Sequence, residues 1–216
     1  MKDILIHQIL ELPQANLIMQ EVLAILNKEK EKRERFYDEI NEQQKVEFIN
    51  GEIIMHSPVN KKHNRISSLL FKLLDTYVIK NDLGFVGIEK IMIALTRNDY
   101  EPDICFFTKE KSKNFTSSQS LFPAPDLIIE ILSKSTEDKD RGIKYQDYEA
   151  HGVHEYWIID PEEETIEQYI LENGSYQLKL KSSEGHIRSV AVTQFEIPIK
   201  AIFDEQENMK VLRGFL

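Results

Sequence analysis

The stretch Pro125-Asp126-Leu127-Ile128-Ile129-Glu130-Ile131-Leu132 decides the fold that we expect for this chain. It is a short apolar run that opens with a proline and closes at Ser133, which is typical of a strand with both faces buried. Side chains alternate between the two faces of a strand, so Asp126 and Glu130 share one face. An ionised carboxylate in such a strand needs a cation, a metal ion or a hydrogen-bond donor beside it. Glu130 is therefore the first candidate for a functional residue.

The composition indicates one globular α/β domain. The chain has 216 residues, of which 41% are hydrophobic, and a net charge of −10. That charge argues against affinity for nucleic acid over the whole surface, but it allows a local basic groove or a site where a divalent cation offsets carboxylates. No apolar run approaches the length needed to cross a bilayer, and the N-terminus does not resemble a secretory signal, so we expect no membrane association. The single cysteine, Cys105, lies in an apolar run, which predicts a buried thiol in the cytoplasm.

Turn residues and apolar spacing predict the elements around the Glu130 strand. Asn50-Gly51 joins two short apolar runs as a hairpin, and Asn173-Gly174 joins a second hairpin near the C-terminus. Helical spacing is found over residues 13–27, 60–80 and 137–150. We expect an N-terminal helical extension, residues 1–44, packed on a single domain of residues 45–216.

A second strand places another carboxylate near Glu130. Pro102-Asp103-Ile104-Cys105-Phe106-Phe107 again has an aspartate after a proline at the start of an apolar run. If the two strands are neighbours, the carboxylates of Asp103 and Glu130 lie close together and repel each other unless a cation intervenes. Mg²⁺ suits such a pair, because it prefers oxygen ligands and bridges carboxylates to a substrate phosphate. It would polarise a phosphodiester and lower the pKa of the attacking water.

A purely structural interpretation of these residues stays open. Glu130 would then pair with Lys144 or Arg141 in a buried ion pair that performs no chemistry. Asp126 and Asp103 would be turn or cap residues at the starts of their strands.

Many of these motifs occur together, and in the same order, in one known family. They are Glu47-Phe48-Ile49-Asn50-Gly51-Glu52-Ile53, Ser57-Pro58, His63, Pro102-Asp103-Ile104, Pro123-Ala124-Pro125 through Ser133, Asp140-Arg141-Gly142 with Lys144 and Tyr148, Gly152-Val153-His154-Glu155-Tyr156-Trp157, and Asp160-Pro161. From Val46 to about Leu171 the chain resembles the Uma-two-type family of restriction-endonuclease-like proteins, which many bacteria carry in numerous copies.

The resemblance implies the PD-(D/E)xK nuclease core, an α/β fold with a mixed central sheet flanked by helices. Asp103 matches the first metal-binding carboxylate of the family and Glu130 the second. The wider superfamily has a lysine two residues after the second carboxylate, where this chain has Leu132. In the family the lysine has moved to the following helix, and Lys144 occupies that position here. We expect its four-carbon side chain to reach back toward Glu130.

Three further residues are candidates for auxiliary roles. Asp126 shares the face of Glu130, and Glu52 and His63 belong to the motifs that carry the resemblance.

The expected function is that of an endonuclease that depends on Mg²⁺ or Mn²⁺ and hydrolyses phosphodiester bonds in DNA. Asp103 and Glu130 would bind the metal, and Lys144 would assist the attacking water. Two alternatives stay open: a nuclease-fold protein without activity that binds nucleic acid or protein, and a hydrolase of small phosphorylated molecules. The C-terminal hairpin would expose a sheet edge, which predicts a homodimer.

Overall fold

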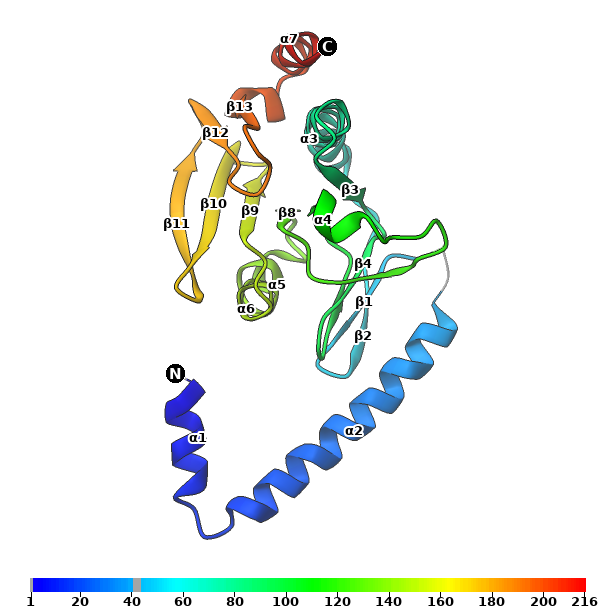
Figure 1. Ribbon diagram of the computed structural model, residues 1–216, viewed down its shortest axis with the longest axis vertical. Coiled ribbons are helices and arrows are strands. Elements are labelled where there is room, and N and C mark those ends of the chain that lie inside the picture. Colours follow the sequence, from blue (N-terminus) through cyan, green and yellow to red (C-terminus); the bar gives the residue numbers. More distant parts are fainter. Residues whose placement is uncertain (1, 41–43) are drawn as a thin grey trace.

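The computed structural model describes residues 2–40 and 44–216 (Figure 1). Its helices are α1 (Lys2–Leu10), α2 (Ala15–Glu39), α3 (Lys61–Lys80), α4 (Lys109–Ser112), α5 (Glu137–Arg141), α6 (Ile143–Ala150) and α7 (Glu205–Phe215), with a 3₁₀ helix, η1 (Ile199–Ile202). Its strands are β1 (Val46–Ile49), β2 (Glu52–Met55), β3 (Gly84–Ile88), β4 (Met92–Ala94), β5 (Asp99–Tyr100), β6 (Ile104–Thr108), β7 (Leu121–Phe122), β8 (Leu127–Ile131), β9 (Glu155–Asp160), β10 (Thr165–Glu172), β11 (Ser175–Ser182), β12 (His186–Arg188) and β13 (Glu196–Pro198). Within the described part of the chain, no helix combines the length and the apolar character needed to span a membrane.

Two mixed sheets form the body of the molecule, which confirms the predicted α/β fold with helices flanking mixed sheets. A six-stranded sheet has the order β11-β10-β9-β8-β6-β3, and a five-stranded sheet has the order β2-β1-β5-β4-β7. In the larger sheet β8 and β9 run parallel, and its other pairs are antiparallel. A parallel pair requires a crossover connection, and α5 and α6 provide it between β8 and β9.

Strand β8 lies in the middle of the larger sheet and is buried along its whole length. Ile129 packs in one apolar cluster with Leu70 and Leu73 of α3. Ile128, which points the opposite way, packs in a second cluster with Tyr148 of α6 and Tyr100 of β5. The alternation predicted for this strand is thus confirmed. It turns Glu130 toward α6 and the five-stranded sheet.

The two predicted hairpins are confirmed. Asn50 and Gly51 both adopt positive φ angles, 50° and 81°, and β1 pairs with β2 in antiparallel register from Val46 opposite Met55 to Ile49 opposite Glu52. This conformation suits glycine and asparagine because other residues pay a steric cost at positive φ. At the other hairpin, β11 forms the edge of the six-stranded sheet.

The helix predicted over residues 137–150 is wrong in one respect, because it is two helices, α5 and α6, separated at Gly142. Gly142 has φ −109° and ψ −99°, and a Cβ atom there would lie 2.6 Å from the carbonyl oxygen of Asp138. Only glycine fits this close approach of the backbone.

The N-terminal helices contact the body through the second half of α2. Phe36 is buried beside Phe48 of β1, with ring centroids 5.6 Å apart, and the Arg33 guanidinium binds the Asp99 carboxylate. By contrast, the large apolar side chains between residues 4 and 26 are mostly exposed, and Leu17 is 67% exposed. Figure 1 shows α1 and the first half of α2 standing away from the two sheets. The predicted packing of the extension therefore applies to the second half of α2, and the boundary at residue 44 stays a prediction.

Candidate active site

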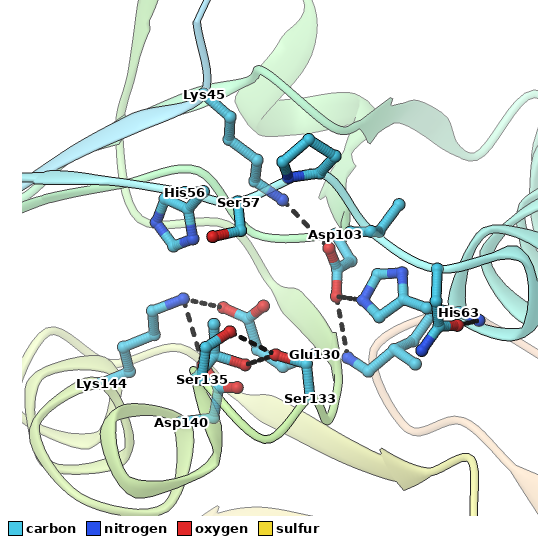
Figure 2. A pocket seen from close by; sticks show the side chains of 15 residues that line it. Lys45, His56, Ser57, His63, Asp103, Glu130, Ser133, Ser135, Asp140 and Lys144 are labelled. Carbon is cyan, nitrogen blue, oxygen red and sulfur yellow. Dashed lines mark hydrogen bonds and ion pairs between the residues drawn. The ribbon is translucent and has the colours of Figure 1, made fainter.

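Asp103 and Glu130 lie side by side because β6 and β8 are antiparallel neighbours. Ile104 is opposite Ile129, so the residue before Ile104 and the residue after Ile129 meet. Both side chains are almost fully buried, yet they line one cavity of about 160 Å³ between the two sheets (Figure 2). Glu130 is therefore not sealed into a dry core.

Three donors hold the Asp103 carboxylate. Lys45 Nζ lies 3.0 Å from Oδ1, His63 Nε2 lies 3.1 Å from Oδ2, and the Ile131 N–H donates to Oδ2 at 2.9 Å. Burial alone would raise the pKa of Asp103, but the hydrogen bond from His63 and the charge of Lys45 outweigh it and hold this pKa well below its usual value. Burial likewise opposes the charged form of His63, and Asp103 nevertheless raises the His63 pKa.

Glu130 is held from the other side of the cavity. Lys144 Nζ and Tyr148 Oη both donate to Glu130 Oε1, each at 3.0 Å. Burial, with the charges of Asp140 and Asp103, outweighs the charge of Lys144 and raises the pKa of Glu130 to about 8. Glu130 therefore keeps a proton at a pH where an exposed glutamate has lost it.

Lys144 is the centre of a buried ion cluster. Its Nζ lies 2.9 Å from Glu47 Oε1, 3.0 Å from Glu130 Oε1 and 3.1 Å from Asp140 Oδ1. Of its three N–H donors, one makes a hydrogen bond to Glu130 Oε1, and the Glu47 and Asp140 carboxylates lie at ion-pair distance from the same ammonium. Burial acts to lower the pKa of Lys144, but the three carboxylates raise it well above its usual value. Lys144 is thus a permanently charged group that fixes its neighbours.

Glu47 extends the cluster to His56. Glu47 is fully buried in β1, and His56 Nε2 lies 3.0 Å from its Oε2. Burial raises the pKa of Glu47, but the charge of Lys144 and the hydrogen bond from His56 lower it to about 2. The His56 ring itself lines the cavity (Figure 2).

Of the six residues predicted for the site, the structure brings together Asp103, Glu130, Lys144 and His63.

Asp126 and Glu52 are not among the described residues that line this cavity. Asp126 precedes Glu130 by four residues, about 13 Å along a strand. There its carboxylate accepts the Thr108 N–H at 2.8 Å and pairs with Lys111 at 2.9 Å. Glu52 lies exposed on β2 and pairs with Lys32. Glu52 lies at the turn end of the hairpin, opposite Ile49, whereas His56, directly after the other end of the same strand, lines the cavity.

The alternative in which Arg141 pairs with Glu130 is wrong. The Arg141 guanidinium binds Glu167 of β10 at 2.9 Å and 3.1 Å and Glu137 of its own helix at 3.0 Å. The other alternative, a buried pair of Glu130 with Lys144, is confirmed as a contact. Both residues also line the cavity, so the pair does not exclude a role in chemistry.

Sequence reasoning did not predict four ionisable residues at or beside the cavity as part of the site: Lys45, Glu47, His56 and Asp140. Glu47 had the same signal as Glu130, a carboxylate inside a short apolar strand, Val46-Glu47-Phe48-Ile49. Lys45 directly precedes β1 and His56 directly follows β2. The alternation of side chains along these strands does not indicate which distant residues they contact.

The donor chemistry around the cavity fits a hard divalent cation. Asp103 and Glu130 present carboxylate oxygens, which Mg²⁺ prefers, and Mg²⁺ is commonly held by only one or two carboxylates plus water and substrate. The described residues contain no group of three or more His, Cys, Asp and Glu side chains already placed as metal ligands. There is nevertheless a surplus of negative charge, since four carboxylates face two lysines: Glu47, Asp103, Glu130 and Asp140 against Lys45 and Lys144. Burial is the main cause of the raised pKa of Glu130, and the neighbouring carboxylates add to it.

The fold defines the class of protein. A crystal structure described as "a putative nuclease belonging to DUF820", from Anabaena variabilis, superimposes with a TM-score of 0.67 at 20% sequence identity, covering 82% of this chain and 96% of that one. The chain therefore has the restriction-endonuclease-like fold.

The family follows from the sequence. The Uma2 family profile, described as "Putative restriction endonuclease", matches residues 31–200, and the chain belongs to this family. Two relatives from Synechocystis sp. are both described as uncharacterized proteins. One, sll1609, is 31% identical over 128 residues, which covers 58% of this chain and 72% of the relative. The other, slr1290, is 28% identical over 134 residues, which covers 61% and 68%.

Proposed function

We propose that this protein is a metal-dependent endonuclease that hydrolyses phosphodiester bonds in DNA. The observation that carries the proposal is the pairing of Asp103 and Glu130 at the floor of one cavity, with a lysine bound to each. Membership of a family of restriction-endonuclease-like nucleases supports the same substrate class.

Asp103 and Glu130 would hold a Mg²⁺ or Mn²⁺ ion. When bound, that ion would polarise the phosphodiester and make water a better nucleophile at neutral pH. The protein's own residues prepare the site. His63 and the Ile131 N–H fix the Asp103 carboxylate, and Tyr148 fixes that of Glu130.

Lys144 acts in this proposal as a positioning residue. We expected it to assist the attacking water, but its buried ammonium lies within ion-pair distance of three carboxylates. Its contribution to the reaction is therefore to keep Glu130 oriented toward the cavity and to limit the repulsion between Glu130 and its acidic neighbours.

The test is cleavage of duplex, single-stranded and branched DNA with Mg²⁺ or Mn²⁺. Wild-type protein should cleave at least one of these, and Asp103→Asn and Glu130→Gln should lose that activity. Lys62→Met is the matched control, because Lys62 is exposed, is not among the described residues that line the cavity, and pairs with Glu162. Titration calorimetry with Mn²⁺ separates the alternatives. A wild-type protein that binds no Mn²⁺, or a Glu130→Gln variant that binds it equally well, leaves the inactive binding module as the function.

A hydrolase of small phosphorylated molecules is the second candidate. It is favoured by the small volume of the cavity, about 160 Å³. Release of phosphate from nucleotides, with no cleavage of any DNA form, would replace the endonuclease proposal with this one.

A homodimer is also part of the proposal, as is a location in the cytoplasm, where the lone thiol of Cys105 would stay reduced. The edge position of β11 supports assembly, and so do the exposed apolar side chains of α1 and α2. Light scattering during size-exclusion chromatography tests it, and a monomeric mass at micromolar concentration would rule the dimer out.

A further inference from the structure

Lys45 differs from Lys144 in how it is held, although each of the two lysines is bound to one of the paired carboxylates. Lys45 directly precedes β1, and its Nζ lies 3.0 Å from Asp103 Oδ1 and 3.3 Å from Glu89 Oε2. Its side chain is 17% exposed, whereas that of Lys144 is 3% exposed. Figure 2 shows the two lysines reaching into the cavity from different sides.

With respect to the described residues, the Lys45 ammonium has a donor to spare. Its hydrogen bonds to described residues go to Asp103 and Glu89, which engage two of its three N–H groups. Lys45 also lines the cavity, so a ligand oxygen that enters can reach the third. A four-carbon side chain that is partly exposed can move its charge by several ångströms without disturbing the core.

The position of Lys45 conflicts with a divalent ion at Asp103. Lys45 already supplies Asp103 with a positive charge at contact distance, in a site where water screens charges poorly. An added cation on the same carboxylate would repel the ammonium and favour its departure from Asp103. Lys144 has no comparable freedom, since it is buried among three partners.

We propose that Lys45 is a substrate-binding residue of this site: it occupies Asp103 while the metal is absent, gives way when a divalent ion binds, and then contacts a phosphate oxygen of the substrate. This inference rests on the proposed nuclease function. It assigns two effects of opposite sign to one side chain, because Lys45 opposes metal binding and promotes substrate binding.

The experiment compares wild type, Lys45→Met, Lys45→Gln and the control Lys62→Met in two binding measurements that involve no turnover. Calorimetry with Mn²⁺ alone should give a Kd for both Lys45 variants that is lower than that of wild type by about fivefold or more, since a competing charge is gone. Fluorescence anisotropy of a labelled DNA oligonucleotide, in Ca²⁺ to suppress cleavage, should show weaker binding by the Lys45 variants. The slope of log affinity against log salt should fall by about 1, the loss of one phosphate contact.

Both changes are required. Lys45 variants that bind Mn²⁺ no more tightly than wild type overturn the inference, and so do variants whose DNA affinity and salt slope match those of Lys62→Met. Circular dichroism melts identify any variant that fails to fold, and the two Lys45 substitutions provide independent readings. Failure of the nuclease proposal has a different signature: wild type itself binds no Mn²⁺, or Glu130→Gln binds it as well as wild type, and both proposals then fall.

Discussion

Lys144 Nζ lies 2.9 Å from Glu47 Oε1, and this buried ion pair ties α6, beside the six-stranded sheet, to β1 of the five-stranded sheet. The same ammonium holds Glu130 and Asp140. One cation therefore sets the positions of three carboxylates that come from three separate parts of the chain. The same residue thus contributes both to the site and, with the apolar cluster between the sheets, to the contact between them.

Lys144→Met should destabilise the protein strongly. The substitution keeps an unbranched side chain of similar length but leaves the buried acidic side chains of Glu47, Asp140 and Glu130 without their cation. Removing one partner of a buried ion pair costs about 3–5 kcal/mol. Urea denaturation at neutral pH measures this loss, and the deficit should shrink in acid as the carboxylates take up protons. Lys179→Met is the matched control. Lys179 is an exposed lysine of β11 paired with Glu172, and its replacement should change stability by about 0.5 kcal/mol or less. Equal stability of the two variants would contradict the role given to Lys144.

Glu130 should make the protein less stable as the pH rises. Its pKa is about 8 in the folded chain against 4.5 for an unperturbed glutamate, so the folded state holds one more proton than the unfolded state between these values. Stability is then greatest below pH 4.5 as far as this group is concerned, and it is lost as the pH rises toward about 8. Glu130→Gln removes the titrating group, so its stability relative to wild type should increase over that range. Denaturation at a series of pH values measures the difference. Glu172→Gln, at an exposed carboxylate of β10, is the control. If the difference in the free energy of unfolding between Glu130→Gln and wild type did not change with pH, the raised pKa would not belong to Glu130.

The residues whose positions could be predicted from the sequence are those that local periodicity governs. Alternation along β8 placed Glu130 on the correct face, and Asn50-Gly51 fixed the first hairpin and its register. The adjacency of Asp103 and Glu130 also followed, once the two strands were taken to be neighbours.

What the sequence did not reveal depends on contacts between distant segments. Lys45 meets Asp103 across 58 residues, and nothing within the hairpin sequence indicates that partner. Asp126 shares a face with Glu130, but sharing a face does not say how far apart two residues lie along the strand. Asp126 lies four residues before Glu130, where its carboxylate accepts the Thr108 N–H. The break at Gly142 depends on a close approach to a carbonyl oxygen, which helical periodicity does not indicate.

Asp126→Ala should affect folding and leave metal binding intact. The substitution removes the acceptor of the Thr108 N–H and the partner of Lys111, so we expect a loss of about 1–3 kcal/mol in the free energy of unfolding. The Mn²⁺ affinity measured by calorimetry should equal that of wild type. Asp103→Asn is the comparison, because it changes a carboxylate inside the cavity and should abolish tight Mn²⁺ binding. If Asp126→Ala weakened Mn²⁺ binding as Asp103→Asn does, Asp126 would be an auxiliary ligand after all.

Mn²⁺ binding should release a proton and strengthen as the pH rises. Lys144 and Tyr148 donate hydrogen bonds to the Glu130 carboxyl. Burial, with the acidic side chains of Asp140, Asp103 and Glu47, outweighs the charge of Lys144 and leaves Glu130 protonated up to about pH 8. A metal ion binds the deprotonated carboxylate, so below that pH each ion must displace the proton, and log Kd should change by about one per pH unit. Above about pH 8 the dependence should level off, because Glu130 has already lost its proton. Calorimetry in buffers of different ionisation enthalpy counts the released protons directly. Lys62→Met should follow the wild-type curve, and any binding that remains in Glu130→Gln should lose this proton release. An affinity independent of pH would mean that the metal does not bind the Glu130 carboxylate.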